Sequence, residues 1–281
     1  MGPSVILRAP AKLNLTLEIL NRRDDGYHNL RSVMVPVSLF DEIELGGTDS
    51  AELDAENLVS KALRALGVPA GQQRAALRKA IPVGAGLGGG SSDAAAILLA
   101  AMDGAFGSLG DRDFLALARG LGSDVPFFLT GTAALVEGTG ERVTALGSVP
   151  PWQATIVKPP LHISTALAYA ALDARTLESR PRNTSPTLQM GEALQRGDFE
   201  AVGTLLGNDF QAPVAAQHRE IGVALDALRK WSSAPAILTG SGSCVFTLWK
   251  EKPPKAELEL PAGFERFDVS FISSPRWRSE A

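Results

Sequence analysis

Residues 81–93 read IPVGAGLGGGSSD, and five glycines fall within the seven positions from 84 to 90. Glycine in regular structure costs roughly 1 kcal/mol relative to alanine, so this density is expected only where the backbone bends tightly or closely approaches a ligand. The alanine-rich run that follows predicts a helix from Ser91 to about Met102. Backbone N–H groups freed by glycine, the positive end of that helix and the hydroxyls of Ser91 and Ser92 would together bind an anion. The stretch therefore predicts a cradle for a polyphosphate.

Three other structures could use such a stretch. Gly84, Gly86 and Gly89 match the Gly-x-Gly-x-x-Gly pattern of dinucleotide-binding folds, but that pattern should open a βαβ unit and precede an acidic residue on the next strand. Here antiparallel strands are expected before the loop, and a helix runs through the distance where the next strand should end. A Walker loop requires Gly-Lys-Ser/Thr, which this stretch lacks. A flexible hairpin tip would not need so many glycines together with two serines. The cradle is the favoured interpretation.

Composition narrows the class of protein and its partners. The 281 residues are enough for one large domain or two ordinary ones. A formal net charge of −4 offers no basic face for a nucleic-acid backbone, so no nucleic-acid partner is expected. The single cysteine, Cys244, cannot form a disulfide within the chain and fits a reducing compartment. The longest apolar run, residues 94–102, is about half of the roughly 20 residues that a membrane span requires, and the N-terminus lacks a signal-peptide core. We therefore expect a cytoplasmic protein without a membrane anchor.

The first half of the chain is predicted to be mixed in secondary structure. Alternation in KLNLTLEIL predicts a strand, with Lys12 and Asn14 on one face and the alternate apolar residues, from Leu13 to Ile19, on the other. Residues 5–45 are predicted to form an antiparallel meander around the Asp-Asp-Gly turn at 24–26. A helix beginning at 54–57, a short strand before the glycines, a helix in DFLALARGL and strands in SDVPFFL and TAALVEG complete this half.

The second half is predicted to begin near Pro150 and Pro151, two consecutive prolines at which the sequence pattern changes. It opens with a predicted strand in ATIVKP and continues with helices in STALAYAAL, PTLQMGEALQRG, DFEAVGTLLG and EIGVALDALRKW. Strands are predicted on both sides of GSGSC and again in RFDVSFI. Antiparallel strands combined with helices indicate an α+β protein, with domains at 1–149 and 150–281.

The segment from Pro82 to Ser92 resembles the second motif of the GHMP kinases, a Pro-x-x-x-Gly-Leu-Gly-Ser/Gly-Ser-Ser loop that binds ATP phosphates. Within that superfamily the chain is similar to the branch that phosphorylates diphosphocytidyl-methylerythritol. The similarity extends, in order, through APAKLNLTLEIL, RDDGYHNLRSVM, ENLV, LGSDVPFFL, ISTALAYAAL, NDFQAPV and LTGSGSCVF. The resemblance implies a two-domain GHMP kinase fold, with a ribosomal-protein-like N-terminal domain that carries the meander and a ferredoxin-like C-terminal α/β sandwich. It also implies transfer of a phosphoryl group from ATP to the tertiary 2-hydroxyl of the erythritol.

The resemblance assigns catalysis to Lys12 and Asp124. Asp124 would accept the proton of the attacking hydroxyl, and Lys12 would keep Asp124 ionised and stabilise the charge that develops on the phosphoryl group. The segment reads Gly-Ser-Asp where the family has Gly-Ala-Asp, a small change that should leave the aspartate in place. From the residues alone, Asp124 could equally well form a turn, and Lys12 could be a solvated strand lysine.

The same resemblance assigns the ATP site. Asn57 would lie near adenine, although capping of a helix is an equally plausible role for it. The residues expected to hold the phosphates are Pro82, Gly84, Gly86, Gly88, Gly89, Gly90, Ser91 and Ser92. The three histidines show no metal-ligand spacing, so no protein metal site is expected, and Mg²⁺ would arrive with ATP.

The acceptor site is also carried over from the family. Tyr27 and Tyr169, the only two tyrosines of the chain, would sandwich the cytosine ring, and His28 would contact its edge. Asn14 would hydrogen-bond to the erythritol hydroxyls, and Thr165 would contact the diphosphate or neighbouring hydroxyls. From the residues alone, the alternative for the tyrosines is ordinary packing, and the alternative for His28 is a solvated side chain.

The late segment LTGSGSC corresponds to a third superfamily motif that would approach the phosphates, although a tight hairpin is an equally good interpretation. Cys244 at its end is expected to be a buried packing residue. Two other functions stay open. Another GHMP kinase, for homoserine or mevalonate, would have no use for the cytidine-binding residues. A regulator that binds nucleotide without turnover would have no use for Lys12 and Asp124.

Overall fold

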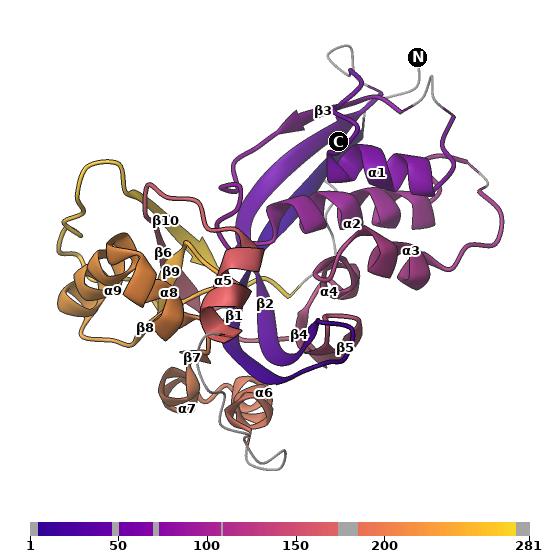
Figure 1. Cartoon of the computed structure of the whole chain (residues 1–281). Coiled ribbons are helices and arrows are strands. Elements are labelled where there is room, and N and C mark those ends of the chain that lie inside the picture. The colour runs from indigo at the N-terminus through magenta and orange to yellow at the C-terminus, as the bar shows by residue number, and fades with distance from the viewer. Residues whose placement is uncertain (1–4, 47–50, 70–72, 108, 174–184, 274–281) are drawn as a thin grey trace.

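The computed structural model describes residues 5–46, 51–69, 73–107, 109–173 and 185–273. In these ranges the chain forms two β-sheets with helices packed on both, which confirms the α+β class (Figure 1). The strands of the first sheet are β1 (Val5–Arg22), β2 (His28–Leu45), β3 (Ala75–Arg78), β4 (Ala133–Gly138), β5 (Arg142–Gly147) and β7 (Gly207–Asn208). The strands of the second are β6 (Gln153–Lys158), β8 (Ala236–Leu238), β9 (Val245–Trp249) and β10 (Glu265–Ser270).

A long antiparallel hairpin of β1 and β2 forms the middle of the first sheet, as the sequence predicted for residues 5–45. The strand order is β5-β4-β2-β1-β7, and β3 pairs with the far end of β2. β5 extends the edge beyond β4 and was not predicted from the sequence. β7 is a two-residue parallel partner of β1 that comes from the second half of the chain. The two halves of the chain therefore share this sheet.

A bulge in β1 changes which face its apolar residues occupy. Pairing with β2 shifts by one residue between Asn14 and Thr16, so one extra residue is inserted in β1. Leu13 therefore lies in the core shared with the second sheet, whereas Leu17 and Ile19 lie in the core beneath the helices of the second half. The prediction that these apolar residues share one face is wrong beyond the bulge, because a one-residue insertion reverses the alternation.

Four helices cover one face of the first sheet (Figure 1). They are α1 (Leu58–Ala65), α2 (Gly89–Met102), α3 (Phe114–Leu121) and α4 (Val125–Thr130). The segment SDVPFFL was predicted as a strand, and that prediction is wrong, because it forms α4. Pro126 lies in the first turn of α4, where a missing N–H is tolerated, and a short apolar run cannot by its period distinguish a buried strand from a buried helix.

The helix after the glycines begins earlier than predicted. α2 starts at Gly89 rather than Ser91, and its N-cap is Gly88 in the left-handed region with φ 73°. Ser91 and Ser92 therefore belong to the first turn instead of capping it. The backbone N–H groups at the start of this helix belong to glycines, so no side chain screens them.

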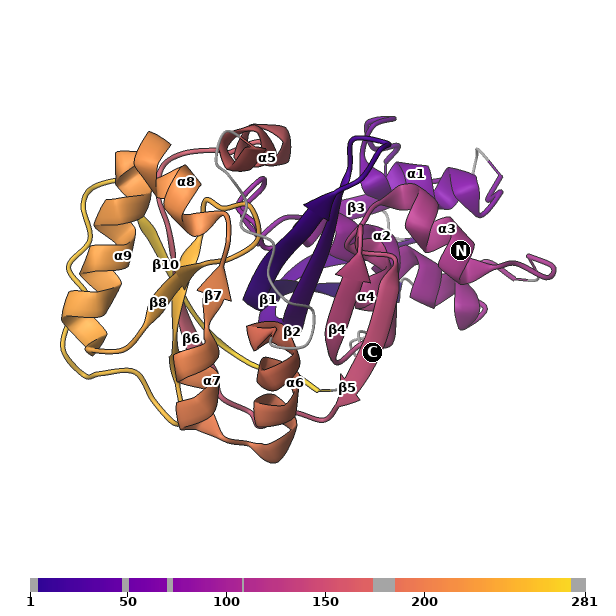
Figure 2. The same ribbon diagram turned by 60° about the horizontal axis from the view of Figure 1, so that its bottom comes forward.

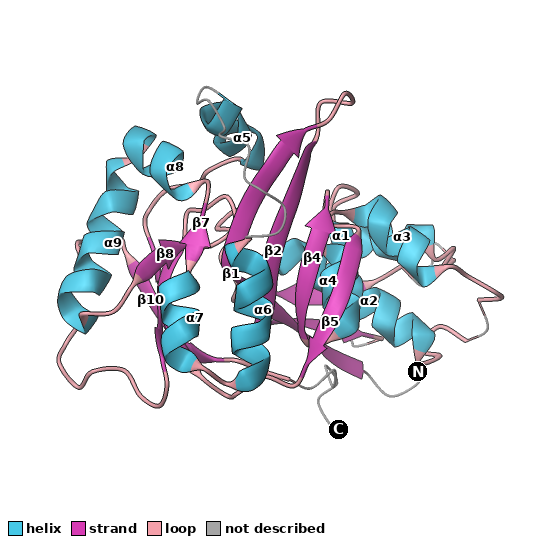
Figure 3. Cartoon of the chain, turned by 90° about the horizontal axis from the view of Figure 1, so that it is seen from below, coloured by secondary structure: helices cyan, strands magenta, loops and turns pink. Residues whose placement is uncertain are grey.

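The second sheet is antiparallel throughout, with the order β10-β6-β9-β8. Its outer helices are α5 (Thr165–Asp173), α8 (Gln211–Gln217) and α9 (Arg219–Ser232), of which α8 was not predicted from the sequence. Two further helices, α6 (Pro186–Arg196) and α7 (Phe199–Leu205), lie at the junction of the sheets (Figures 2 and 3). Leu13 of β1, Met190 of α6 and Phe246 of β9 belong to one buried cluster, so a single core joins the two halves.

In the part of the chain that is described, no helix combines the length and apolarity needed to cross a bilayer.

Candidate active site

A cavity of about 490 Å³ lies where the two halves of the chain meet. It is bounded by two glycine-rich segments, which we call the first glycine loop (residues 84–90) and the second glycine loop (residues 239–244). Most of the residues predicted for the site line this cavity: Lys12, Asn14, Asn57, Pro82, Gly84, Gly86, Gly88, Gly89, Gly90, Ser91, Asp124, Thr165 and Tyr169. Tyr27, His28 and Ser92 do not line it.

The first glycine loop uses its glycines for backbone geometry and for close approach. Gly84, Gly86 and Gly88 have φ of 61°, 78° and 73°, a region that residues with a side chain rarely adopt. A Cβ added at Gly86 would lie 2.2 Å from the carbonyl oxygen of Thr239, so the second glycine loop packs directly against the first. Only glycine permits this packing.

Hydrogen bonds hold the two loops together and attach them to β1. The Cys244 N–H donates to the Ala85 carbonyl over 3.1 Å, and the Lys12 N–H donates to the Leu87 carbonyl over 3.0 Å. The Asn14 N–H donates to Thr239 Oγ1 over 3.0 Å. The second glycine loop therefore forms one wall of the cavity, through Gly240, Ser241 and Gly242. Cys244 itself is buried, as predicted, and burial raises the pKa of its thiol far above the ordinary range.

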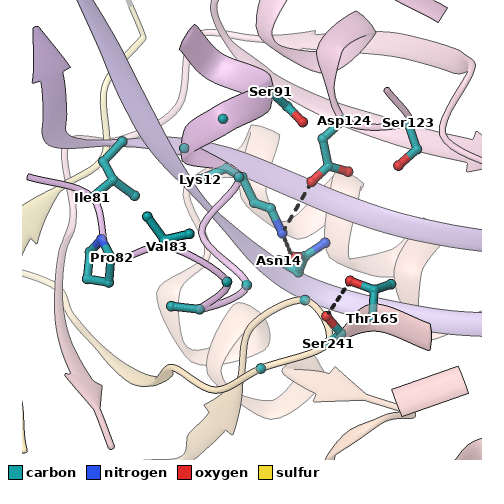
Figure 4. A pocket seen from close by; sticks show the side chains of 18 of the residues that line it. Lys12, Asn14, Ile81, Pro82, Val83, Ser91, Ser123, Asp124, Thr165 and Ser241 are labelled. Atoms are coloured by element: carbon teal, nitrogen blue, oxygen red, sulfur yellow. Dashed lines mark hydrogen bonds and ion pairs between the residues drawn. The ribbon is translucent and has the colours of Figure 1, made fainter. Parts of the chain in front are cut away.

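Lys12 and Asp124 face one another across the cavity (Figure 4). Lys12 Nζ lies 3.9 Å from Asp124 Oδ2, and the lysine side chain is only 3% exposed whereas that of the aspartate is 28% exposed. Burial lowers the pKa of Lys12, and the nearby Asp124 only partly offsets this effect. Asp124 holds its place as the N-cap residue of α4 and has no side-chain capping bond. Its carboxylate is therefore available to a ligand in the cavity.

The amide of Asn14 orients the lysine. Asn14 Oδ1 accepts a hydrogen bond from Lys12 Nζ, and Asn14 Nδ2 donates to Ser32 Oγ over 2.8 Å. On the opposite side of the cavity the hydroxyls of Thr165 and Ser241 lie 3.2 Å apart and connect the start of α5 to the second glycine loop (Figure 4). Side chains of both halves thus present hydroxyl and amide groups to the same space.

Of the three residues predicted to bind cytosine, Tyr169 and His28 lie against each other, and Tyr27 lies apart from them. Tyr169 of α5 stacks on His28, with ring centroids 4.9 Å apart and 20° between the planes, and it forms a T-shaped pair with Phe210 at a centroid distance of 4.8 Å. Burial, with a smaller contribution from Asp124, raises the pKa of Tyr169 to about 12. Tyr27, the residue before β2, is 67% exposed. The structure thus brings His28, and not Tyr27, against the Tyr169 ring.

Sequence reasoning missed an ion cluster that lines the cavity through two of its residues, Lys79 and Asp93. Lys79 follows β3, and its ammonium group donates to Asp41 Oδ2 of β2 and, over 2.7 Å, to Asp93 Oδ2 of α2. Both carboxylates are buried. Asp41 is 38 positions from Lys79 in sequence, so no local spacing could have revealed the cluster. Ser123 at the cavity was missed as well.

The described residues include no cluster of three or more histidine, cysteine or acidic side chains arranged to hold a metal ion. Among the described residues that line the cavity, the cations are Lys12 and Lys79 and the carboxylates are Asp93 and Asp124, so these side chains together contribute no formal net positive charge. A polyphosphate in this cavity would therefore need backbone N–H groups and a dissolved cation to balance its charge.

Both halves of the chain are similar to known protein domains. The model of the GHMP kinase N-terminal domain matches residues 57–132, and the GHMP kinase C-terminal model matches residues 190–266. A solved homoserine kinase from Cytophaga hutchinsonii has the same fold, with a TM-score of 0.64 over 99% of this chain and 98% of its own, at 18% identity. The fold is thus that of a GHMP kinase.

Two further relatives are much more similar in sequence. The 4-diphosphocytidyl-2-C-methyl-D-erythritol kinase of Pseudothermotoga lettingae is 36% identical over 88% of this chain and 92% of its own length. A crystal structure of a 4-(cytidine 5'-diphospho)-2C-methyl-D-erythritol kinase matches with a TM-score of 0.72 and 37% identity, over 86% of this chain and 89% of that one. The chain belongs to the 4-diphosphocytidyl-2-C-methyl-D-erythritol kinase family.

Proposed function

We propose that this protein transfers the γ-phosphoryl group of ATP to the 2-hydroxyl of 4-diphosphocytidyl-2-C-methyl-D-erythritol, yielding the 2-phosphate and ADP. The observation that carries the proposal is the Lys12–Asp124 pair, which lies in the cavity between two packed glycine loops in a chain of this kinase family. Family members use ATP, and the pair supplies a carboxylate and a cation on the two sides of a reacting hydroxyl.

In the proposed reaction Asp124 accepts the proton of the 2-hydroxyl as its oxygen forms a bond to the γ-phosphorus and the bond to the β,γ-bridging oxygen breaks. Lys12, desolvated beneath the loops, stabilises negative charge on the transferring group. N–H groups of the first glycine loop and of the first turn of α2 bind the phosphates. A tertiary hydroxyl is hindered, which makes a positioned base more important.

We propose that Mg²⁺ enters as the ATP complex. The two lysines that line the cavity are formally balanced by the carboxylates of Asp93 and Asp124, so most of the negative charge of the polyphosphate is left for a divalent cation to neutralise. Phosphate oxygens and water would be its ligands, and the Ser91 hydroxyl, which lines the cavity, would hydrogen-bond to phosphate or to a metal-bound water. The ion would supply charge neutralisation during phosphoryl transfer.

For the acceptor we propose that Tyr169 provides a flat surface for the cytosine ring, with His28 at its edge and Tyr27 covering the other side. In the structure His28 lies flat on Tyr169, so the base would have to displace the imidazole before it could stack. Asn14 and Thr165 would contact the hydroxyls and the diphosphate of the same substrate. Asn57, whose side-chain oxygen caps α1, has its amide group left to contact adenine.

The direct test mixes the purified protein with Mg-ATP and the diphosphocytidyl substrate and follows ADP release together with ³¹P spectra. Turnover that falls by a factor of about 10² to 10⁴ in Asp124→Asn, which has nearly the same shape, would support both the reaction and the base. Unimpaired turnover in Asp124→Asn would refute the role of the base. ATP binding without any phosphorylated product from the parent protein would refute the substrate assignment.

Replacement of Tyr169 separates this proposal from another GHMP kinase activity. If the ring binds cytosine, Tyr169→Ala should raise the KM of the diphosphocytidyl substrate by about tenfold or more, since stacking on an aromatic ring contributes roughly 1–3 kcal/mol per base. Homoserine and mevalonate should be turned over by neither protein. Phosphorylation of either compound at a comparable rate would contradict the proposal.

We further propose two domains, 1–149 and 150–281, and a cytoplasmic location. The two family models match on either side of residue 149, which supports the division. The one cysteine is a free thiol, which suits a reducing compartment.

A further inference from the structure

The first glycine loop has two ends, and one ion cluster, whose two carboxylates are buried, contacts both. The loop is entered from β3 through residues 79–81, and it leaves into α2 at Gly89. Lys79 stands at the entrance, Asp93 lies in α2, and Asp41 of β2 lies beside both of them. We call these three residues the loop clasp.

Asp41 fixes the entrance by three hydrogen bonds. Its Oδ1 accepts the N–H of Ala80 over 2.7 Å and the N–H of Ile81 over 2.8 Å, and its Oδ2 accepts from Lys79 Nζ. The Asp41 side chain is fully buried. Bonds from three consecutive residues to one buried carboxylate determine the path of the backbone into Pro82, two residues before the loop begins.

Lys79 connects this entrance to the exit. Its Nζ donates to Asp93 Oδ2 over 2.7 Å, and Asp93 is only 4% exposed at its side chain. The exit packs directly on the same group, because a Cβ added at Gly89 would lie 3.0 Å from Ile81 Cγ2 and 3.2 Å from Asp41 Oδ2. The clasp therefore closes the base of the loop, whereas the second glycine loop supports its middle.

A loop rich in glycine has much conformational freedom to lose when it binds a ligand, and fixing its ends in advance lowers that loss. We propose that Lys79, held by Asp41 and Asp93, is a positioning residue that sets the first glycine loop in the conformation that binds ATP. This role rests on the proposed ATP-dependent function. It is separate from catalysis, because Lys79 acts on the loop and Lys12 acts at the reacting atoms.

The test compares Lys79→Met with Lys61→Met in the otherwise intact chain. Lys61 is a matched control, since its Nζ also lies 2.7 Å from a carboxylate, that of Glu56, but the pair is exposed. Lys79→Met should weaken the Kd of Mg-ATP, measured by calorimetry, by about tenfold or more. The KM of the acceptor and the kcat at saturating ATP should change by less than about threefold, and amide exchange in residues 82–90 should become faster. Lys61→Met should change none of these quantities.

A merely structural role would give a different result. If Lys79→Met lowers the Tm but leaves the Kd of ATP within about twofold of the parent value, the proposal is wrong. It is also wrong if ATP affinity and acceptor KM weaken equally, or if exchange in residues 82–90 is unchanged.

A second variant keeps the test decisive if Lys79→Met folds poorly, because that change leaves buried carboxylates without their cation. In Lys79→Met/Asp93→Asn the Tm should recover, since one uncompensated charge is removed, but ATP affinity should stay weak because the clasp is still open. Recovery of both would show that only charge balance matters. Calorimetry and exchange need no turnover, so a parent protein that binds ATP but does not phosphorylate the acceptor would refute the proposed function and leave the clasp intact.

Discussion

Two lysines line the same cavity and differ in how their charge is balanced. Lys12 is 3% exposed and has one carboxylate, that of Asp124, at 3.9 Å. Lys79 is 30% exposed and donates to two carboxylates, those of Asp41 and Asp93, at hydrogen-bonding distance. Burial lowers the pKa of Lys12, and Asp124 does not compensate. Burial also opposes the charge of Lys79, but Asp93 and Asp41 outweigh it and raise the pKa.

This difference separates two uses of a buried cation. The carboxylate next to Lys12 does not offset the cost of burying its ammonium group. Negative charge on a bound phosphoryl group would offset that cost, so such a lysine favours a charged ligand. At Lys79 the neighbouring carboxylates outweigh the cost of burial. Such a lysine needs no ligand to stabilise its charge and can serve to connect the segments that carry the carboxylates. The local balance of charge is therefore consistent with the proposed roles of the two lysines, catalysis for Lys12 and support of the loop for Lys79.

The largest effect is expected at Lys12. Lys12→Met should lower kcat by a factor on the order of 10³, because one preorganised charge at the reacting group is lost. The Tm should stay unchanged or rise, since burial of the ammonium costs more than Asp124 returns. Steady-state kinetics and thermal denaturation of the same sample measure both. A large fall in Tm with kcat retained would reverse the roles assigned to the two lysines.

The second prediction concerns the pH dependence that burial of the Asp93 carboxyl group creates. Burial, with a contribution from Asp41, raises the pKa of Asp93 from 3.8 to about 7 even though Lys79 opposes the shift. Between pH 4 and 7 the folded protein holds a proton on Asp93 that the unfolded chain has lost, so the free energy of unfolding should fall as pH rises through this window and level off above it. At about 1.4 kcal/mol per pKa unit, the decline is at most about 4 kcal/mol.

Asp93→Asn tests this dependence, because the amide keeps an acceptor for Lys79 but cannot ionise. Denaturation at pH 5, 6, 7 and 8 should show a weaker fall for the variant, which should be the more stable protein at pH 8. Parallel curves for the two proteins would show that Asp93 is ionised in the folded state at every pH tested.

The third prediction concerns the packing that surrounds Lys12 and not Lys79. Gly86→Ala would force a Cβ to within 2.2 Å of the Thr239 carbonyl at φ 78°, so the two glycine loops would separate. The free energy of unfolding should fall by about 3 kcal/mol through strain and overpacking, and ATP binding should weaken. Gly26→Ala is the matched control, because its φ is 86° but nothing lies within 4 Å of the added Cβ. It should cost only about 1–2 kcal/mol and leave ATP affinity unchanged. Equal effects of the two changes would mean that the loops do not depend on this contact.

The difference between the lysines also shows what a sequence can reveal. Lys12 and Asn14 share a strand face, which alternation predicts, and the resemblance of short motifs pointed to Asp124. Both of these predictions, the shared strand face and the role of Asp124, depend on patterns within short stretches of sequence. The same patterns gave the hairpin of residues 5–45 and most helices correctly.

What the sequence did not reveal depends on contacts between distant segments. The bulge after Asn14 leaves no mark in the alternation, yet it turns Leu17 toward the cavity. The segment after Asp124 is apolar and short, so its helical form is decided by packing and by Pro126. The clasp joins Asp41 to Lys79 and α2 through the fold alone. Pairing of charges over such distances requires coordinates.

The smallest effect is expected at a third lysine, outside the cavity. Lys158 Nζ of β6 lies 3.3 Å from Glu265 Oε1 of β10, and the glutamate is 56% exposed. Such a pair typically contributes less than about 1 kcal/mol, because water screens it and side-chain entropy opposes it. Lys158→Met should therefore change the Tm little and leave the kcat and the Kd of ATP unchanged, by the same assays as above. If Lys158→Met weakens ATP binding as much as Lys79→Met does, the effect on the loop does not depend on the carboxylates around the lysine. The balance of local charge would then not distinguish the lysines.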